Sequence, residues 1–293
     1  MSNETITLVP AAQLSLESLA FVLNHAYADY YLPIWLDGEQ FQQMCEVEDV
    51  DLQASAVAMD GDAPVGIAMI ARRGDRGWVS GVGVRPGWRR QGIARQLLHQ
   101  IQVTARGLKL RVLQLEVLFQ NAAGAALYQQ LGFRYARDLF VLTQQASHRE
   151  IVTPPPAIRR AVPATLLAHY ADFHTFEAPW QRELASLRHR APDLHGLGYW
   201  EQGRLVGYIL YKSLPKYQFI YDLAAAPTHP RRLEIARELL LAAQSFRINA
   251  GGYIINVPAE DPLLPAFKEV AYRVWLHQHE LAWQVASGDS ETE

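Results

Sequence analysis

The chain has 293 residues, 49% of them hydrophobic and 19% charged, which is the composition of a globular protein and excludes a disordered or fibrous one. Lysine and arginine number 27 against 30 aspartate and glutamate, a formal net charge of −3, so the basic surface that a nucleic-acid partner requires is not expected. The length favours two domains, and the single cysteine excludes an internal disulfide and a cysteine-rich zinc site.

Nothing in the sequence predicts a membrane partner or export. No apolar stretch approaches the ~18–20 residues that cross a bilayer. Residues 1–6 are polar and lack the basic start and apolar run of a secretion signal. We therefore expect a soluble, cytoplasmic protein.

The predicted elements of the first half mix helices and strands. In chain order they are a strand at 5–10, helices at 14–31 and 38–46, strands at 54–59, 65–71 and 78–84, a helix at about 92–105, a strand at 112–119, a helix at 122–131 and a strand at 133–142. Strands on both sides of a helical crossover imply a mixed sheet. The predicted fold class is α/β, with a central mixed sheet flanked by helices.

A proline-rich stretch separates the two halves. Residues 152–156 read Val-Thr-Pro-Pro-Pro. Three prolines continue neither a helix nor a central strand and favour an extended spacer. We predict one domain at 1–150 and a second at 157–293.

A basic loop between a strand and a helix carries the clearest chemical signal. The strand ends at Val84, the loop contains Arg89 and Arg90, and the helix begins directly after Gly92. Helix N-termini expose unpaired backbone N–H groups and the positive end of the helix dipole, so they bind anions. A glycine there lets a phosphate approach closely, and this segment is predicted to cradle a pyrophosphate. Neither a Walker loop nor a dinucleotide-binding fingerprint fits it.

The loop, Arg89-x-x-Gly92-x-Ala94 after Val-Arg-Pro, resembles motif A of the GNAT superfamily of N-acetyltransferases, which bind acetyl-CoA. A second stretch, from Asn121 to Leu127-Tyr128 and Gly132-Phe133, is similar to the family pattern Asn-x-x-Ala-x-x-Leu-Tyr-x-x-x-Gly-Phe, with glycine at position 124 in place of alanine. The resemblance covers residues 5–142 in the family's order.

The resemblance implies roles for individual residues. Backbone groups of Val82, Gly83 and Val84 would bind the pantetheine arm, and Asn121 would also contact the cofactor arm. Tyr128 would protonate the departing thiolate, a step that requires a positioned donor. The pyrophosphate would be held at Arg89, Arg90, Gln91, Gly92, Ile93, Ala94 and Arg95.

The general base and the acceptor site are less defined. The attacking ammonium must first lose a proton, and Glu116, on its predicted strand, is a candidate base, acting directly or through water. Tyr30, Tyr31 and Asp29 lie in the stretch that faces the acceptor in the resembled family.

The second half repeats the order of the first. Residues 227–240 align with 86–98 after one insertion, and strands are predicted at 199–202, 205–211, 219–223, 253–257 and 274–283. The chemical residues do not repeat, because Glu234, Asp261 and Lys268 stand where the first half has its glycine, asparagine and tyrosine. Glu234 would place a carboxylate where the pyrophosphate belongs. We predict a degenerate copy that covers the first sheet, shapes the acceptor cleft or forms a homodimer.

Two histidines, His277 and His279, alternate along a predicted strand and could face the same side. The sequence offers no evident third ligand, so no metal is expected.

We therefore predict a tandem GNAT protein whose first domain transfers an acetyl group from acetyl-CoA to a primary amine by direct attack, with a small-molecule acceptor. One alternative is a mycothiol-synthase-like acyltransferase, in which by resemblance the C-terminal copy is catalytic. The other is a non-catalytic acyl-CoA-binding or interaction module. The identity of the amine stays open.

Overall fold

The computed structural model describes residues 6–31, 34–146, 153–246 and 250–285. Contacts divide the chain into two units, Met1–Ala136 with Glu280–Glu293, and Arg137–His279. Residues 1–5, and residues 147–152 at the start of the predicted linker, lie outside the described residues. The mixed α/β class predicted from the sequence is confirmed.

The first unit follows the predicted order of helices and strands. Its elements, with 3-10 helices written η, are β1 (Thr7–Pro10), η1 (Ala11–Gln13), α1 (Leu16–Tyr27), α2 (Gly38–Glu48), β2 (Ala56–Asp60), β3 (Ala63–Arg73), β4 (Arg76–Val84), η2 (Pro86–Trp88), α3 (Ile93–Gly107), β5 (Val112–Leu118) and α4 (Ala122–Gln130). Its strand order is β1-β2-β3-β4-β5, followed by β12 (Arg273–Gln284). The pairs are antiparallel as far as β4, and β4 and β5 are parallel.

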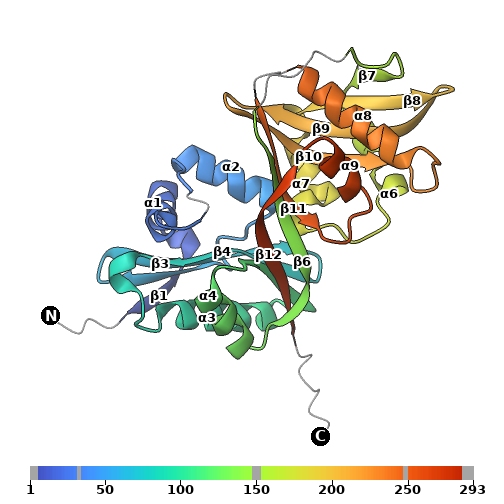
Figure 1. Cartoon of the computed structure of the whole chain (residues 1–293). Coiled ribbons are helices and arrows are strands. Elements are labelled where there is room, and N and C mark those ends of the chain that lie inside the picture. Colours follow the sequence, from blue (N-terminus) through green and yellow to red (C-terminus); the bar gives the residue numbers. More distant parts are fainter. Residues whose placement is uncertain (1–5, 32–33, 147–152, 247–249, 286–293) are drawn as a thin grey trace, which may run out of the picture. The chain divides into compact units, whose positions relative to one another are not determined.

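Helices cover both faces of this sheet (Figure 1). Ala68 and Ile70 of β3 belong to the core beneath α3 and α4, whereas Ile67 and Met69 belong to the core beneath α1 and α2. Burial on both faces explains why β3 is an unbroken apolar run and not an alternating one. Among the described helices none is both long and apolar enough to cross a membrane.

Side-chain caps fix where α1 and α2 begin. Ser15 accepts a hydrogen bond from the backbone in the first turn of α1. Asp37 and Gln40 form a reciprocal capping box at α2, with N···O distances of 2.8 and 3.1 Å. The Asn24 side chain donates to the carbonyl of Leu36 at 2.8 Å and accepts from its N–H at 2.9 Å, which joins α1 to the segment before α2.

The second unit repeats this plan. Its elements are β6 (Arg134–Gln144), β7 (Ile158–Ala161), α5 (Pro163–Leu167), α6 (Tyr170–Phe173), η3 (Trp180–Arg182), α7 (Leu184–Arg190), η4 (Ala191–Asp193), β8 (His195–Glu201), β9 (Arg204–Ser213), β10 (Tyr217–Ala225), α8 (Arg232–Ser245), β11 (Gly251–Pro258) and α9 (Leu264–Glu269), with β12. The strand order is β12-β6-β11-β10-β9-β8-β7. As β4 and β5 do, β10 and β11 run parallel and pair over three residues at their starts.

The strand that follows α4 does not close the first sheet. The predicted strand at 133–142 is present as β6, but it pairs antiparallel with β11 and not with β5, with Leu139 opposite Pro258. The alternation of apolar residues indicates a strand. It cannot choose between β5 and β11, because the free edges of two strands offer the same backbone donors and acceptors.

The C-terminal end of β12, and not β6, lies next to β5 in the first unit. Leu281 is buried in the core beneath α3 and α4, and Trp283 packs on Phe133 with ring centroids 6.3 Å apart. The Val285 N–H donates to the carbonyl of Arg111 at 3.0 Å. The observed division of the chain thus differs from the predicted 1–150 and 157–293 at the last strand of each half.

Candidate active site

The loop after β4 leads directly into the N-terminus of α3. Gly92 caps the helix with φ of 81° and ψ of 0°, and Arg90 also has a positive φ, 65°. No side chain caps this helix, and its first turn holds no acidic residue. A Cβ atom on Gly92 would find no heavy atom within 4 Å, so the space before the helix is open. The backbone N–H groups of this turn are therefore placed to receive an anion.

The residues predicted to hold the pyrophosphate differ in what they can offer. Arg90 and Gln91 are exposed beside the helix start. The Ile93 side chain is buried in the core, so this residue can contribute only its backbone N–H. Arg95 is exposed and hydrogen-bonds Gln130 of α4. Cationic side chains and free amides thus lie together at one helix end.

Arg89 has a different role from the one its position suggests. Its guanidinium donates to both carboxylate oxygens of Asp29, at 2.6 and 2.7 Å, and to the carbonyls of Val84 and Ala26 at 2.9 and 3.1 Å. The hydrogen bonds from Arg89 hold the pKa of the Asp29 carboxyl below its usual value. Arg89 therefore fastens the end of α1 to the cradle loop, and Asp29 is engaged in the same link.

The two parallel strands in front of the cradle separate early. Only Arg76–Trp78 of β4 pair with Val112–Gln114 of β5. Beyond these pairs, the N–H and the carbonyl of Val82 interact with the hydroxyl of Tyr27, at 3.2 and 3.1 Å. Tyr27 thus occupies the backbone groups that the sequence assigned to the pantetheine arm. The contact between Tyr27 and Val82 was not predicted from the sequence. The only signal there is that Tyr27 lies three residues before Tyr30, a spacing that places two side chains on one face of a helix.

Glycine at position 83 allows α1 to approach β4 closely. A Cβ atom there would lie 2.7 Å from Cβ of Ala26 and 3.1 Å from the Tyr27 ring. Such contacts require the helix to move away. The glycine is therefore needed for packing as well as for access to the strand backbone.

Tyr128 lies on α4 and is buried at 9% exposure, packed on Phe133 with ring centroids 6.0 Å apart. Burial, followed by the nearby Tyr27 and Tyr30, raises the pKa of its hydroxyl above the ordinary tyrosine value. Tyr128 belongs to the core on the α3 and α4 face, whereas Tyr27 belongs to the core on the opposite face. Tyr128 remains protonated at neutral pH, as a proton donor must.

The Asn121 side chain caps its own helix and hydrogen-bonds Tyr30, which follows the end of α1. Its side-chain oxygen accepts from the N–H of Gly124 at 3.0 Å, which caps α4. A Cβ atom at position 124 would lie 2.6 Å from the Asn121 amide nitrogen, so the family's alanine would require the Asn121 side chain to shift. Burial raises the pKa of Tyr30, while hydrogen bonds from Asn121 and the Leu118 backbone counteract the shift. The exposed Tyr31 hydroxyl reaches the Gln120 carbonyl at 3.5 Å. Both predicted acceptor residues therefore lie beside the start of α4.

Glu116 lies on β5, just beyond the last residue paired with β4. Its Oε2 accepts a hydrogen bond of 2.7 Å from the indole N–H of Trp78. Leu115 and Val117 face the core beneath α3 and α4, so Glu116 points to the opposite face of the sheet. This is the face that α1 covers, where Tyr30 and Tyr31 follow the end of the helix.

The corresponding helix start in the second unit is filled by a carboxylate. Glu234, in the first turn of α8, accepts two hydrogen bonds of 3.0 Å from Arg231, which also donates to Glu201 at 3.0 Å. The hydrogen bonds from Arg231 lower the pKa of Glu234, so the side chain is ionised. The first turn of α8 thus carries a carboxylate paired with Arg231, whereas the first turn of α3 carries no acidic residue.

The opening between β10 and β11 also differs from its counterpart. Asp222, fully buried on β10, accepts from the Tyr208 hydroxyl at 2.8 Å and contacts His174 at 3.1 Å. Buried Arg182 lies 3.6 Å from Asp222 and 3.7 Å from Asp261, and donates to the backbone of β11. Although burial alone disfavours the charged imidazole, Asp222 raises the pKa of His174. A network of Asp222, His174 and Arg182 therefore links β10 to β11 beyond the residues through which these strands pair.

A family model decides the assignment. The model of the acetyltransferase (GNAT) family matches residues 20–133 and, separately, residues 165–267. The chain belongs to the GNAT acetyltransferase family. The two matches correspond to the two repeats predicted from the sequence, and the tandem GNAT organisation is confirmed.

Solved structures share this tandem GNAT fold over nearly the whole chain. The GCN5-related N-acetyltransferase from Sphaerobacter thermophilus aligns with a TM-score of 0.73 and 15% identity, covering 97% of this chain and 96% of that one. A tandem GNAT protein from the clavulanic acid biosynthesis pathway aligns at 0.71 and 15%, covering 97% and 100%. A putative acetyltransferase from Pyrococcus horikoshii gives 0.69 and 16%, covering 97% and 91%. A search of curated proteins by sequence found no match.

Proposed function

We propose that the first unit transfers an acetyl group from acetyl-CoA to the primary amine of a small molecule, by direct attack and without a covalent enzyme intermediate. The observation that carries the proposal is the open, uncapped helix start at Gly92, directly after a strand that separates from its parallel neighbour. Burial, with Tyr27 and Tyr30 nearby, raises the pKa of the Tyr128 hydroxyl, which keeps it protonated. Membership of the GNAT family supports the same reaction class.

Acetyl-CoA would bind along the cradle loop and the adjoining part of β4. Amides from Gln91 to Arg95, together with exposed Arg90, would bind the pyrophosphate, and the Val82 backbone would bind the pantetheine arm after Tyr27 gives up its hydrogen bonds. Asn121 would remain a helix cap that touches the arm.

The amine nitrogen loses two protons during the reaction, and the departing thiolate gains one. The ammonium gives its first proton to Glu116, directly or through water, and the free amine attacks the thioester carbonyl carbon. As the carbon–sulfur bond breaks, Tyr128 protonates the departing thiolate. The nitrogen then gives up its second proton to solvent, and solvent returns a proton to Tyr128 after the tyrosine has acted as the acid. Burial raises the pKa of Tyr128, and burial in the same apolar surroundings would also raise the pKa of the departing thiol.

The second unit is proposed to bind no acetyl-CoA. Glu234 lies at its helix start and Arg182 with Asp222 in its opening. This arrangement counts against the mycothiol-synthase-like alternative, which requires a working C-terminal copy. Retention of Tyr128 counts against a purely binding module.

A turnover screen tests the proposal. Thiol release from acetyl-CoA would be followed across a panel of small amines, amino acids, aminoglycosides and peptide N-termini, with product masses determined. We expect release that depends on one class of amine and is lost in the Tyr128→Phe variant. Tight acetyl-CoA binding without release for any amine would favour the binding module instead.

Removing the Tyr27 hydroxyl should tighten cofactor binding. In Tyr27→Phe, the Val82 backbone groups lose their partner and become available to the ligand, so we expect acetyl-CoA affinity to rise ~2–10-fold, from a net 0.5–1.5 kcal/mol per hydrogen bond. The melting temperature of the free protein should fall. Calorimetry measures both, and Tyr31→Phe, whose exposed hydroxyl contacts Gln120 and not β4, is the matched control. Unchanged or weaker binding would mean that the arm does not pair with Val82.

Restoring a glycine in the second unit should not restore a site. In a chain that carries both Gly92→Glu and Glu234→Gly, we expect no acetyl-CoA binding heat, because Arg182 with its carboxylates and Lys268 remain. Wild-type protein should titrate with one site per chain. A binding stoichiometry near one in the double variant would contradict this view of the second repeat.

A further inference from the structure

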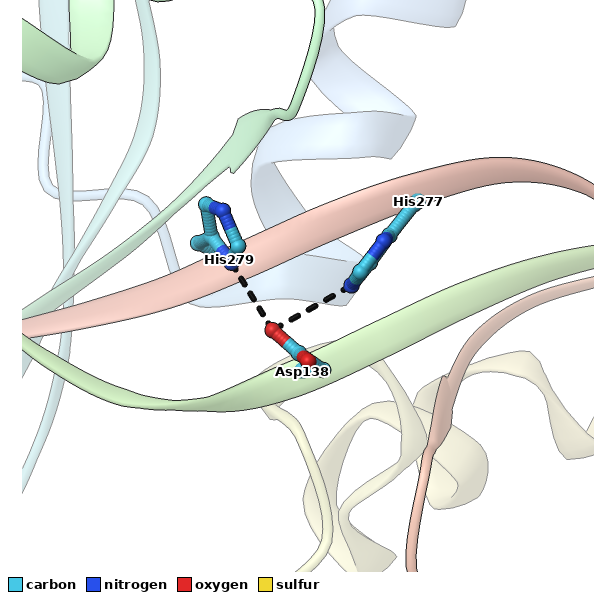
Figure 2. A group of neighbouring side chains, drawn as sticks. All are labelled: Asp138, His277 and His279. Atoms are coloured by element: carbon cyan, nitrogen blue, oxygen red, sulfur yellow. Dashed lines mark hydrogen bonds and ion pairs between the residues drawn. The ribbon is translucent and has the colours of Figure 1, made fainter.

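Three potential metal ligands converge in the second unit. Figure 2 shows Asp138 of β6 between His277 and His279 of β12, with both imidazoles directed at the same carboxylate oxygen. His279 Nδ1 lies 2.8 Å and His277 Nε2 lies 3.2 Å from Asp138 Oδ1. The three ligand atoms lie within 4.8 Å of one another.

The strands explain this convergence. Successive side chains of a strand point to opposite faces, so residues 277 and 279 share one face of β12. The strand order places β6 beside β12, which brings in a carboxylate from 141 residues away in the chain. The Asp138 carbonyl accepts from the N–H of Ala259 at 3.0 Å, and His277 packs against Phe140 at a ring distance of 5.3 Å. The backbone and one ring are thus held before any ligand arrives.

We propose that Asp138, His277 and His279 bind one divalent transition-metal ion, and that the ion is zinc. Two imidazole nitrogens with one carboxylate oxygen are a usual zinc ligand set, whereas magnesium and calcium prefer oxygen ligands alone. Zinc bonds of ~2.0–2.2 Å require ligand atoms roughly 3.3 Å apart in a tetrahedron. The observed 2.8 and 3.2 Å contacts to Asp138 are within about half an ångström of this spacing, and the two imidazole nitrogens lie within 4.8 Å of each other.

Charge and access favour a cation here. The carboxylate brings a negative charge, and imidazoles bind metals in their neutral form. The side chains are 27–34% exposed, so an ion can enter and water can supply the fourth ligand. The ion would link the first part of β12 to β6 and so stabilise the second unit.

Zinc binding to the full-length, untagged protein tests the proposal. After treatment with a chelator, calorimetry with zinc chloride should give about one ion per chain. A hundredfold excess of zinc over Kd should raise the melting temperature of the second unit by ~5–10 °C. Cobalt, used as a coloured substitute, should show the visible absorption of a low-coordinate site that includes nitrogen ligands.

Variants decide whether these three residues are the ligands. His277→Gln and Asp138→Asn should each weaken zinc binding by at least ~10–100-fold, more than the loss of a supporting residue around a metal usually costs. His169→Gln is the matched control, because His169 pairs with Asp172 at 3.4 Å in the same unit but outside the cluster. Circular dichroism checks that the variants fold. If folded His277→Gln and Asp138→Asn bind zinc as tightly as wild type does, or if wild type binds none, the proposal is overturned.

Discussion

Replacing Tyr128 with phenylalanine is expected to lower the turnover number by ~10²–10⁴-fold, the usual contribution of general acid catalysis. The affinity for acetyl-CoA should change little, because the phenol acts only when negative charge develops on sulfur, in the transition state. The ring remains and keeps its contact with Phe133, so the melting temperature should stay close to that of wild type. Steady-state kinetics with calorimetric binding measures the two effects separately.

Three controls make the Tyr128 result specific. Tyr211→Phe removes another buried hydroxyl, on β9 of the second unit, and should leave turnover unchanged. An acyl donor with a more acidic leaving thiol needs less protonation, so the loss should shrink with it. Because the pKa of Tyr128 is raised above ~10, the wild-type rate should show no decline from its ionisation below that pH. Full turnover of Tyr128→Phe, with chemistry shown to limit the rate, would make Tyr128 a packing residue.

Replacing Gly92 with glutamate is expected to abolish acetyl-CoA binding. The new carboxylate would lie at the anion-binding end of α3, and two like charges in contact cost several kcal/mol, which is more than ~100-fold in affinity. In the second repeat the carboxylate at the helix start, Glu234, is paired with Arg231 of the same chain. Titration calorimetry should show no saturable heat.

Two further substitutions at position 92 separate charge from backbone strain. Gly92 has a φ of 81°, so any side chain there costs ~1–2 kcal/mol, although a Cβ atom meets no neighbour. Gly92→Ala should therefore weaken binding by at most ~30-fold. Gly92→Gln has the size of glutamate without its charge and should bind measurably. If Gly92→Gln and Gly92→Glu lose binding equally, the cause is bulk or strain and not the charge.

The features that the sequence predicted correctly depend on neighbouring residues. The strand, loop and helix around Gly92 can be predicted because their signals are local. These signals are the glycine, the preceding Pro86 and the spacing of apolar residues in α3, and each acts on residues close to it in the sequence. The repeat could be predicted for the same reason, since the order and spacing of strands and helices recur after residue 157. The position of Glu234 in the first turn of a helix follows from the same local pattern.

Contacts between side chains and residues distant in the sequence were decided only by the tertiary structure. No local pattern shows that Arg89 bonds Asp29, or that Tyr27 covers the Val82 backbone. Nor does any local pattern show that Arg182 lies beside Asp222 of β10. These partners are distant in the chain, and many similar side chains compete for each, so only the packed fold selects the pair.

Strand exchange is the largest feature that the sequence left open, and it also accounts for Asp138. The sequence determines that β6 and β12 are strands and that His277 and His279 share a face. It does not determine which strand lies beside them, because the backbone groups along a strand edge are the same for every residue type. Only the strand order β5-β12-β6-β11 brings Asp138 of β6, the last strand of the first half, beside His277 and His279 of β12, the last strand of the second half.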